Sequence, residues 1–387
     1  MNHHIVRGWM VCVLSGLVTA AAPRPSLALE TRRLDYLQQS NPPLQERLNR
    51  VREGIFSGKA PPEQAIRELK AILAVDPGSA EGHLLLGIAY RSSGSSDLMG
   101  EAVAELRQAL ALNPSFAPAR FYLAHIYLDL GRAERAREEL QTALAQAPGN
   151  PQFMALLGEA ERQLKNPGRS IELNTQALKV DESFAESRYY LGLALFDLGK
   201  RNEAIRELER VVQSGPNAVD AYLSLGTLYV EAGRYDDALK VLRQGTQIDP
   251  SRPEIRIQMA RAYRSKGLLD SADAQLKLAT PKGATTLASS LYQHQQIEFD
   301  LTLEQGLVKL KRGQLEAAAS AFRKALSMDP NHGLANRYVA EVYLLQERYA
   351  LASEHAVRAE KFGSPLPEDK RKVLTERLRK KTPGGGE

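Results

Sequence analysis

Small residues recur along this chain at a nearly constant spacing. Glycine or alanine returns at intervals of 37, 34, 34, 34, 34, 46 and 34 residues, at Gly87, Ala124, Gly158, Gly192, Gly226, Ala260, Gly306 and Ala340. A second small residue follows twelve positions later, or fifteen in the first case, at Ala102, Ala136, Ser170, Ala204, Ala238, Ala272, Ala318 and Ala352. Such regularity indicates an array of repeated units rather than one ordinary core, which 387 residues would exceed.

Each feature of the unit has a physical cause. Apolar residues such as Leu225 and Leu228 have helical spacing and give a first helix one inward face. Gly226 between them lets a neighbouring helix approach closely, and we call this residue the small position of its repeat. Gly233 comes where the first helix must end, and Ala238 lies on a second helix. Proline closes many units, at Pro77, Pro114, Pro148, Pro216, Pro250 and Pro330.

The pattern resembles the tetratricopeptide repeat. The stretch YLSLGTLYVEAGRYDDALKVLRQGTQIDP follows it closely, and the resemblance runs from about Gln45 to Gly363. Eight repeats are clear, and a degenerate ninth with Glu53 at its small position precedes them. The third repeat departs from the pattern at Glu161 and Asn174, where an aromatic and a large apolar residue are usual. The resemblance implies an all-α fold, a TPR-type α-solenoid of antiparallel helix pairs forming a right-handed superhelix.

The first residues differ in composition from the rest. A short, weakly basic start precedes an apolar run of 14 residues from Trp9 to Ala22, and small residues then offer cleavage after Ala20 or after Ala28. This layout predicts a secretory signal peptide over residues 1–28, with an uncleaved N-terminal anchor as the alternative. Cys12, the only cysteine, lies inside this run, so we expect no disulfide in the mature protein.

These features predict the domain organisation. An N-terminal linker over residues 29–44 precedes the repeat array at 45–364, which carries an insertion at about 281–299. A C-terminal capping helix and flexible tail occupy residues 365–387. From Pro367 to Lys381 this end holds seven basic and three acidic residues, which suits a solvated cap, with contact to anionic lipid or polymer as the alternative.

The resemblance also implies where a partner binds. First helices of this family line a concave groove, and groove-facing residues lie six and three before the small position and one, four and five after it. Aromatic and arginine side chains most often anchor interfaces. These offsets give the candidate groove residues Arg91, Phe121, His125, Arg162, Tyr189, Leu193, Phe196, Thr227, Arg261 and Arg264. Packing between neighbouring first helices is the alternative explanation of these residues.

The insertion suggests a second surface. Pro281 and Gly283 interrupt the chain, and no strong breaker follows until Gly306, so we expect a first helix extended backwards to about Thr286. One face of this extension would form an interaction ridge, or else a packing spacer between two parts of the array, and carries Ala288, Leu291, Tyr292, Gln295 and Phe299.

Catalytic patterns are missing from the sequence. The histidines after the apolar run are scattered without the HExxH spacing of a helical zinc site, and no glycine-rich phosphate loop follows a strand. We therefore expect no enzyme activity, no metal and no cofactor. The net charge of +5 includes Arg7 and Arg24 of the expected signal peptide, so it is weak evidence for nucleic-acid binding, which we do not expect.

The resulting expectation is an exported, protein-binding scaffold in a periplasm or cell envelope, or else secreted, that serves assembly or secretion. The likeliest partner class is a protein or peptide. Two alternatives stay open: an accessory factor that binds polysaccharide or polymer during export, and an envelope scaffold held by an uncleaved N-terminal helix. Membrane contact is expected only through that N-terminal segment or the basic C-terminal tail.

Overall fold

The computed structural model describes residues 42–215, 218–280 and 291–381, and within these ranges every regular element is a helix. The all-α expectation is therefore confirmed. The described residues up to Leu225 form one compact unit, unit 1, and those from Gly226 onward form a second, unit 2. The expected signal peptide, residues 1–28, lies outside the described residues.

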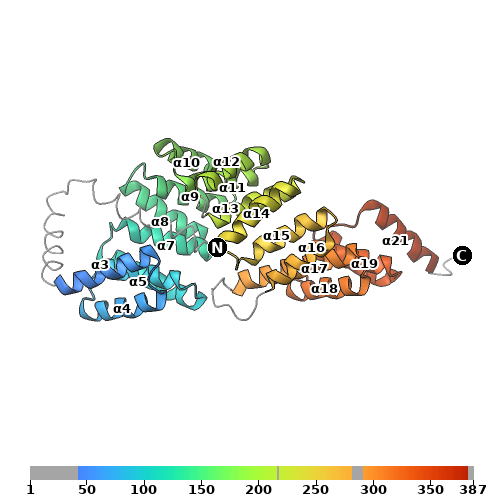
Figure 1. Ribbon diagram of the computed structural model, residues 1–387, viewed down its shortest axis with the longest axis horizontal. Helices are drawn as coiled ribbons and strands as arrows, with labels where there is room; N and C mark the ends of the chain where they lie inside the picture. The colour runs from blue at the N-terminus through green and yellow to red at the C-terminus, as the bar shows by residue number, and fades with distance from the viewer. Residues whose placement is uncertain (1–41, 216–217, 281–290, 382–387) are drawn as a thin grey trace. The chain divides into compact units, whose positions relative to one another are not determined.

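Unit 1 is a stack of antiparallel helix pairs (Figure 1). The pairs are α3 with α4, α5 with α6, α7 with α8, α9 with α10 and α11 with α12, and each first helix also contacts the second helix of the pair before it. α3 contains Gln45, where the repeat array is expected to start. The bounds are α3 Pro42–Ser57, α4 Pro62–Val75, α5 Ala80–Ser92, the short 3-10 helix η1 Ser96–Leu98, α6 Met99–Leu112, α7 Ala117–Asp129, α8 Ala133–Gln146, α9 Pro151–Gln163, α10 Pro167–Val180, α11 Ala185–Asp197, α12 Arg201–Ser214 and α13 Val219–Glu231, whose second half belongs to unit 2.

Unit 2 repeats the same arrangement. α15 pairs with α16, α17 with α18 and α19 with α20, and the last helix, α21, packs on α20. Leu366 and Leu374 are buried in this terminal core, so α21 covers the end of the stack with an amphipathic helix. The bounds are α14 Tyr235–Ile248, α15 Pro253–Ser265, α16 Leu269–Ala279, α17 Leu291–Lys311, α18 Leu315–Met328, α19 Gly333–Leu345, α20 Tyr349–Lys361 and α21 Glu368–Lys381.

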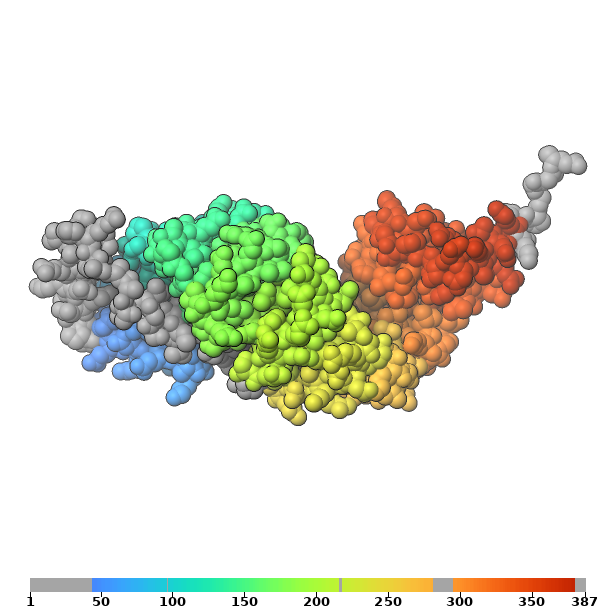
Figure 2. All heavy atoms as spheres, turned by 90° about the horizontal axis from the view of Figure 1, so that it is seen from above, coloured from blue at the N-terminus to red at the C-terminus, as the bar shows by residue number. Residues whose placement is uncertain are grey.

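The small positions are packed as the sequence predicts. A Cβ atom built on Gly226 would lie 2.4 Å from the side chain of Leu242, and one on Gly306 would lie 2.4 Å from the ring of Phe322. Both distances are shorter than any real carbon contact, so a larger residue would force the two helices of the hairpin apart. In the space-filling view, the green segment of unit 1, α9 to α12, forms one continuous packed surface (Figure 2).

The turn between the two helices of a repeat uses a left-handed residue. Gly233 has φ = 73°, as the sequence predicts for the end of a first helix. At the same place in the third and eighth repeats, Lys165 has φ = 66° and Glu347 has φ = 59°. A side chain in this conformation costs on the order of 1 kcal/mol, so these two turns are held by the packing on either side of them.

The polar departures of the third repeat are accommodated locally. Glu161 accepts a hydrogen bond from the Asn166 amide at 3.0 Å, and the Asn174 amide donates to the Ser170 carbonyl at 2.8 Å. These bonds satisfy the Glu161 carboxylate and the Asn174 amide N–H, whereas the buried Asn174 Oδ1 makes no hydrogen bond with any described residue. The helix pair α9–α10 therefore keeps the geometry of its neighbours.

Only part of the predicted insertion ridge can be placed. Ala288 lies outside the described residues, and Leu291 and Tyr292 lie in α17 without described side chains. Gln295 is exposed, whereas Phe299 is buried and its ring lies 4.6 Å from that of His332. Phe299 therefore belongs to the core of unit 2, because its ring gains more from burial there than from solvent exposure.

No helix in the described ranges combines the length and the apolar character that crossing a membrane requires.

Candidate functional site

The candidate site lies on the first helices of unit 1. Successive first helices contact one another, α5 with α7, α7 with α9 and α9 with α11, more than successive second helices do. The side chains at the predicted groove offsets on these four helices are called the unit-1 face. Because neighbouring first helices lie close together, a side chain on one helix reaches its counterpart on the next.

Two arginines of the unit-1 face form matching ion pairs across neighbouring helices. Arg91 Nε on α5 donates to Asp129 Oδ2 on α7 at 2.9 Å, and Arg162 Nη1 on α9 donates to Asp197 Oδ2 on α11 at 2.8 Å. Each arginine lies four residues after its small position, and each aspartate lies five after the next one. The repeat geometry therefore brings these two offsets together.

Aromatic rings fill the space beside Arg91. Phe121 and His125 on α7 meet edge to face with ring centroids 4.7 Å apart, and Phe153 on α9 lies 5.9 Å from Phe121. Burial lowers the pKa of His125 well below its ordinary value, and the positive charge of Arg91 lowers it further. His125 is therefore a neutral aromatic side chain at physiological pH.

Two carboxylates lie between α9 and α11. Glu159 accepts two hydrogen bonds from Arg162, at 2.8 and 2.9 Å, and one from Gln163 at 3.0 Å. Glu186, only 8% exposed, makes no ion pair with any described residue. Burial chiefly raises the pKa of Glu186 to about 7, and the charge of Glu159 adds to this rise, while hydrogen bonding from Tyr190 and the charge of Arg91 oppose it.

The remaining predicted residues of unit 1 lie on α11. The Tyr189 hydroxyl is 3.4 Å from Ser224 Oγ, and burial raises the pKa of Tyr189 well above its ordinary value. Leu193 and Phe196 are half-buried on the same helix. The structure therefore places Arg91, Phe121 and His125 in one group and Arg162, Tyr189, Leu193 and Phe196 in a neighbouring group on the same face.

The predicted residues of unit 2 form a separate cluster. Arg261 and Arg264 on α15 both pair with Glu304 on α17, which is 1% exposed, and Arg261 Nη2 also lies 3.2 Å from Asp300 Oδ1. Thr227 is half-buried on α13 and belongs to unit 2. Here the acidic and basic side chains neutralise each other within the chain.

Several residues beside these clusters are absent from the sequence-based set, among them Glu186, Asp300, Tyr122 and Glu304. Glu186 and Asp300 lie six before their small positions, an offset that the prediction includes, but their acidic character did not distinguish them. Tyr122 and Glu304 lie two before their small positions, an offset that the family pattern assigns to packing. Glu186 and Asp300 would have been found by comparing the charges at two offsets, one after a small position and six before the next.

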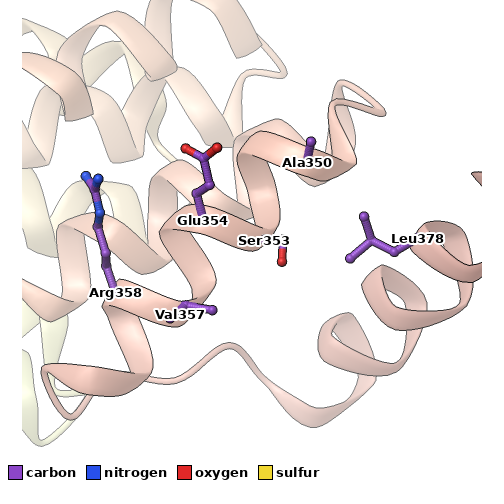
Figure 3. A pocket seen from close by; sticks show the side chains of 6 residues that line it. All are labelled: Ala350, Ser353, Glu354, Val357, Arg358 and Leu378. Carbon is purple, nitrogen blue, oxygen red and sulfur yellow. The ribbon is translucent and has the colours of Figure 1, made fainter. Parts of the chain in front are cut away.

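The described ranges contain no group of three or more His, Cys, Asp or Glu side chains arranged to hold a metal ion. A depression of about 560 Å³ lies between α20 and α21, where Ser353 and Val357 face Leu378 (Figure 3). Another of about 380 Å³ opens beside Arg162 and is lined by Gly131, Ala133, Glu134, Gln163, Leu164 and Lys165. Both are open surface features, and neither contains a nucleophile next to a base.

Comparison with solved structures places the fold among helical repeat proteins. The chain is 14% identical to the APC/C hetero-tetramer Cut9–Hcn1, covering 82% of this chain and 59% of that one with a TM-score of 0.64, so it spans about three fifths of that protein. It is 19% identical to the human IFIT1 dimer with PPP-AAAA (81% of this chain, 72% of that one, TM-score 0.53). A tetratricopeptide repeat protein from Parabacteroides merdae is 15% identical (69% and 100%, TM-score 0.51). These likenesses concern the fold alone. No curated protein matches the chain in sequence.

Two family models of the tetratricopeptide repeat match the sequence itself. One matches residues 99–160 and 229–294, and the other matches residues 189–253 and 303–365. Together they span more than half of the chain, and the described part of each matched segment is mainly helical. The chain therefore belongs to the tetratricopeptide repeat family.

Proposed function

We propose that this protein is an exported scaffold that holds a partner protein or peptide on the unit-1 face. Tetratricopeptide repeats generally form protein-interaction scaffolds and are generally non-catalytic. The observation that carries the proposal is the set of buried and half-buried charges and rings on the first helices, from Arg91 to Phe196. Packing alone would favour apolar residues there, because burying an ionised side chain costs several kcal/mol unless it is paired.

Export is supported by the sequence of residues 1–28. The apolar run from Trp9 to Ala22 is shorter than the roughly 20 residues of a membrane span and ends among small residues. We place the mature protein in a periplasm or cell envelope. Mass spectrometry of the N-terminus tests this: cleavage after Ala20 or Ala28 is expected, and a mature chain that retains Trp9 would contradict it.

The partner is tested by crosslinking inside the cell. A photoreactive phenylalanine replaces Phe196, which is half-buried on the unit-1 face, and in a matched control replaces Val180, which is 59% exposed at the end of the second helix α10. Position 196 is expected to capture one or a few defined proteins that position 180 does not. Identical capture at both positions would contradict the proposal. Recovery of glycan at position 196 would favour the polymer-binding alternative instead.

A further inference from the structure

The repeat geometry fixes which side chains face each other across neighbouring first helices. In unit 2, Arg261 lies one residue after its small position and pairs with Asp300, six before the next, at 3.2 Å. In unit 1 the same two offsets hold Glu159 and Glu186. The charge of Glu159 acts on Glu186, so the two carboxylates lie near each other as their counterparts do. One unit therefore has a cation and an anion where the other has two anions.

Glu186 differs from other acidic residues at its offset. Glu81 on α5 pairs with Arg52, and Glu254 on α15 lies 3.4 Å from Arg252 Nε. Glu186 is 8% exposed, yet no described lysine or arginine forms an ion pair with it. A position at the first turn of a helix favours negative charge, but this contribution is common to all these residues. The absence of an ion pair distinguishes Glu186 from Glu81 and Glu254.

No lysine or arginine on the described neighbouring helices forms an ion pair with Glu186, although the charge of Arg91 acts on it. On α5, Arg91 is held by Asp129, and on α9, Arg162 is held by Glu159 and Asp197. On α7, His125 is neutral for the reasons given above. On α11, Tyr190 donates a hydrogen bond toward Glu186 and carries no charge. The unit-1 face thus has five carboxylates against two guanidinium groups, and one of the five, Glu81, pairs with Arg52 on α3. The face contains Glu81, Asp129, Glu159, Glu186 and Asp197 against Arg91 and Arg162.

One hydroxyl group at this place lacks a hydrogen-bond partner. The hydroxyl of Tyr122 on α7 is buried, with the residue 2% exposed, and it makes no hydrogen bond. The charges of Arg91 and Glu186 both act on this hydroxyl. Buried polar groups are nearly always hydrogen-bonded in folded proteins. Glu186 has the hydrogen bond from Tyr190 but no ion pair, and the Tyr122 hydroxyl has no hydrogen bond, so both groups are able to accept from a further donor.

We propose that the unit-1 face recognises a partner peptide through an arginine side chain, whose guanidinium takes beside Glu186 the place that Arg261 takes beside Asp300 in unit 2. This inference rests on the proposed scaffold function and names the chemistry of its partner. A guanidinium donates to the Glu186 carboxylate and to the Tyr122 hydroxyl oxygen together, since it presents five N–H groups in a fixed plane. The negative balance of the face attracts the cation before contact.

The interaction depends on pH in a defined direction. The free protein carries Glu186 with a pKa of about 7, raised mainly by burial. Only the ionised carboxylate attracts a guanidinium, so peptide affinity is high above pH 7 and falls as the pH drops below it. The charged groups that act on Glu186 from α5 and α9 are Arg91, which opposes the rise in its pKa, and Glu159, which adds to it.

The test uses the purified full chain and a fluorescein-labelled peptide, Gly-Ser-Gly-Arg-Gly-Ser-Gly, in fluorescence anisotropy. A second peptide replaces arginine with citrulline, which has the same shape but no charge. At about pH 8 the arginine peptide is expected to bind about tenfold tighter than the citrulline peptide, and the advantage is expected to shrink several-fold at about pH 5.5. Glu186→Gln is expected to abolish the advantage. Glu172→Gln, an exposed glutamate on the second helix α10, is the matched control and is expected to leave it unchanged.

A second variant keeps the test independent of the first. Glu159→Arg supplies a guanidinium within the chain, as Arg261 does in unit 2, and is expected to displace the peptide while Glu186 is still present. Far-UV circular dichroism checks that each variant is folded. Equal binding of both peptides, unchanged binding by Glu186→Gln, or no binding by the unaltered chain at about 1 mM peptide would overturn the inference. The crosslinking from position 196 would still decide the scaffold function separately.

Discussion

The two units of this protein use the same pair of repeat positions in opposite ways. In unit 2, Arg261 and Asp300 face each other and neutralise each other. In unit 1, Glu159 and Glu186 face each other, and burial and the neighbouring charge raise the pKa of Glu186 to about 7. The backbone geometry sets which side chains meet, and residue identity decides whether the charge is satisfied within the chain or left for a partner.

A second pair of positions shows the same contrast. Arg91 and Arg162 in unit 1 each pair with an aspartate on the next first helix. Arg264 in unit 2 has Lys311 at that offset, and it turns to the buried Glu304 instead. Repulsion between Arg264 and Lys311 disfavours the arginine conformation seen in unit 1. Arg264 instead points to Glu304, which lies two residues before the small position Gly306. The four predictions below test this comparison.

The largest effect is expected from removing the buried acid of unit 2. Glu304→Gln leaves Arg261 and Arg264 without the carboxylate that both contact, and a partly buried unpaired cation is costly. We expect the free energy of unfolding to fall by about 3 kcal/mol near neutral pH. Urea unfolding followed by far-UV circular dichroism measures it. A change below about 0.5 kcal/mol would show that the cluster is screened like a surface ion pair.

The same substitution in unit 1 is expected to have the opposite sign. Burial keeps Glu186 protonated in the folded state up to about pH 7, whereas its ordinary pKa is 4.5. Between these values only the unfolded chain is ionised, so stability falls as pH rises and the full penalty remains above pH 7. Glu186→Gln carries no such penalty, so it should be more stable than the unaltered chain by about 2 kcal/mol near pH 8 and equal to it below about pH 4. Destabilisation at pH 8 would contradict the pKa shift.

Removing one arginine of unit 1 is expected to have a smaller effect. Arg91→Gln loses the ion pair with Asp129, in which the arginine side chain is 9% exposed, and should lower the free energy of unfolding by about 1 kcal/mol. The same change removes a positive charge beside His125, whose pKa should then rise. Titration of the histidine ring protons by NMR measures this shift. An unaltered His125 titration would show that burial alone depresses its pKa.

The smallest effect is expected from giving unit 2 the ion pair of unit 1. Lys311→Asp places an acid at the offset where Asp129 and Asp197 pair with arginine. Lys311 Nζ lies 3.4 Å from the Arg264 carbonyl, so residue 311 is close to Arg264 and the new aspartate is expected to form an ion pair with its guanidinium. We expect a gain of about 0.5 kcal/mol in urea unfolding. Lys311→Ala is the control, because it removes the like charge without adding an acid. Equal effects of the two changes would show that no new pair forms.

The fold follows from the sequence because its determinants are local and repeated. Gly226 predicts the close approach to Leu242, and Gly233 predicts the left-handed turn, since each reflects a constraint within one hairpin. Lys165 and Glu347 in the same turn show that packing can hold a residue whose own preference is different. The insertion is less predictable, since Phe299 shares a face with Gln295 but is buried by its neighbours.

The site follows only in part. The groove offsets predict Arg91, Phe121 and His125 on one face, and in the structure the rings of Phe121 and His125 contact each other. The offsets do not reveal which carboxylate lacks an ion pair, because this depends on the acids that each arginine contacts, and Arg162 contacts Glu159 and Asp197. Which acid an arginine contacts depends on side-chain rotamers and on competing charges from three helices. The spacing of residues within one helix does not predict this pairing.

The separation of facing positions from small positions has a consequence for how such arrays diverge. A mutation at Glu159 or Arg261 changes the charge that one hairpin presents to the next. The small position of a repeat, such as Gly226 against Leu242, makes a different contact, within the hairpin, and is unaffected. Duplication of a hairpin copies both halves of a facing pair into new neighbours, and a single later codon change converts a matched pair into an unmatched one. Recognition can therefore evolve by exchanging one side chain per repeat, without passing through an unfolded intermediate sequence.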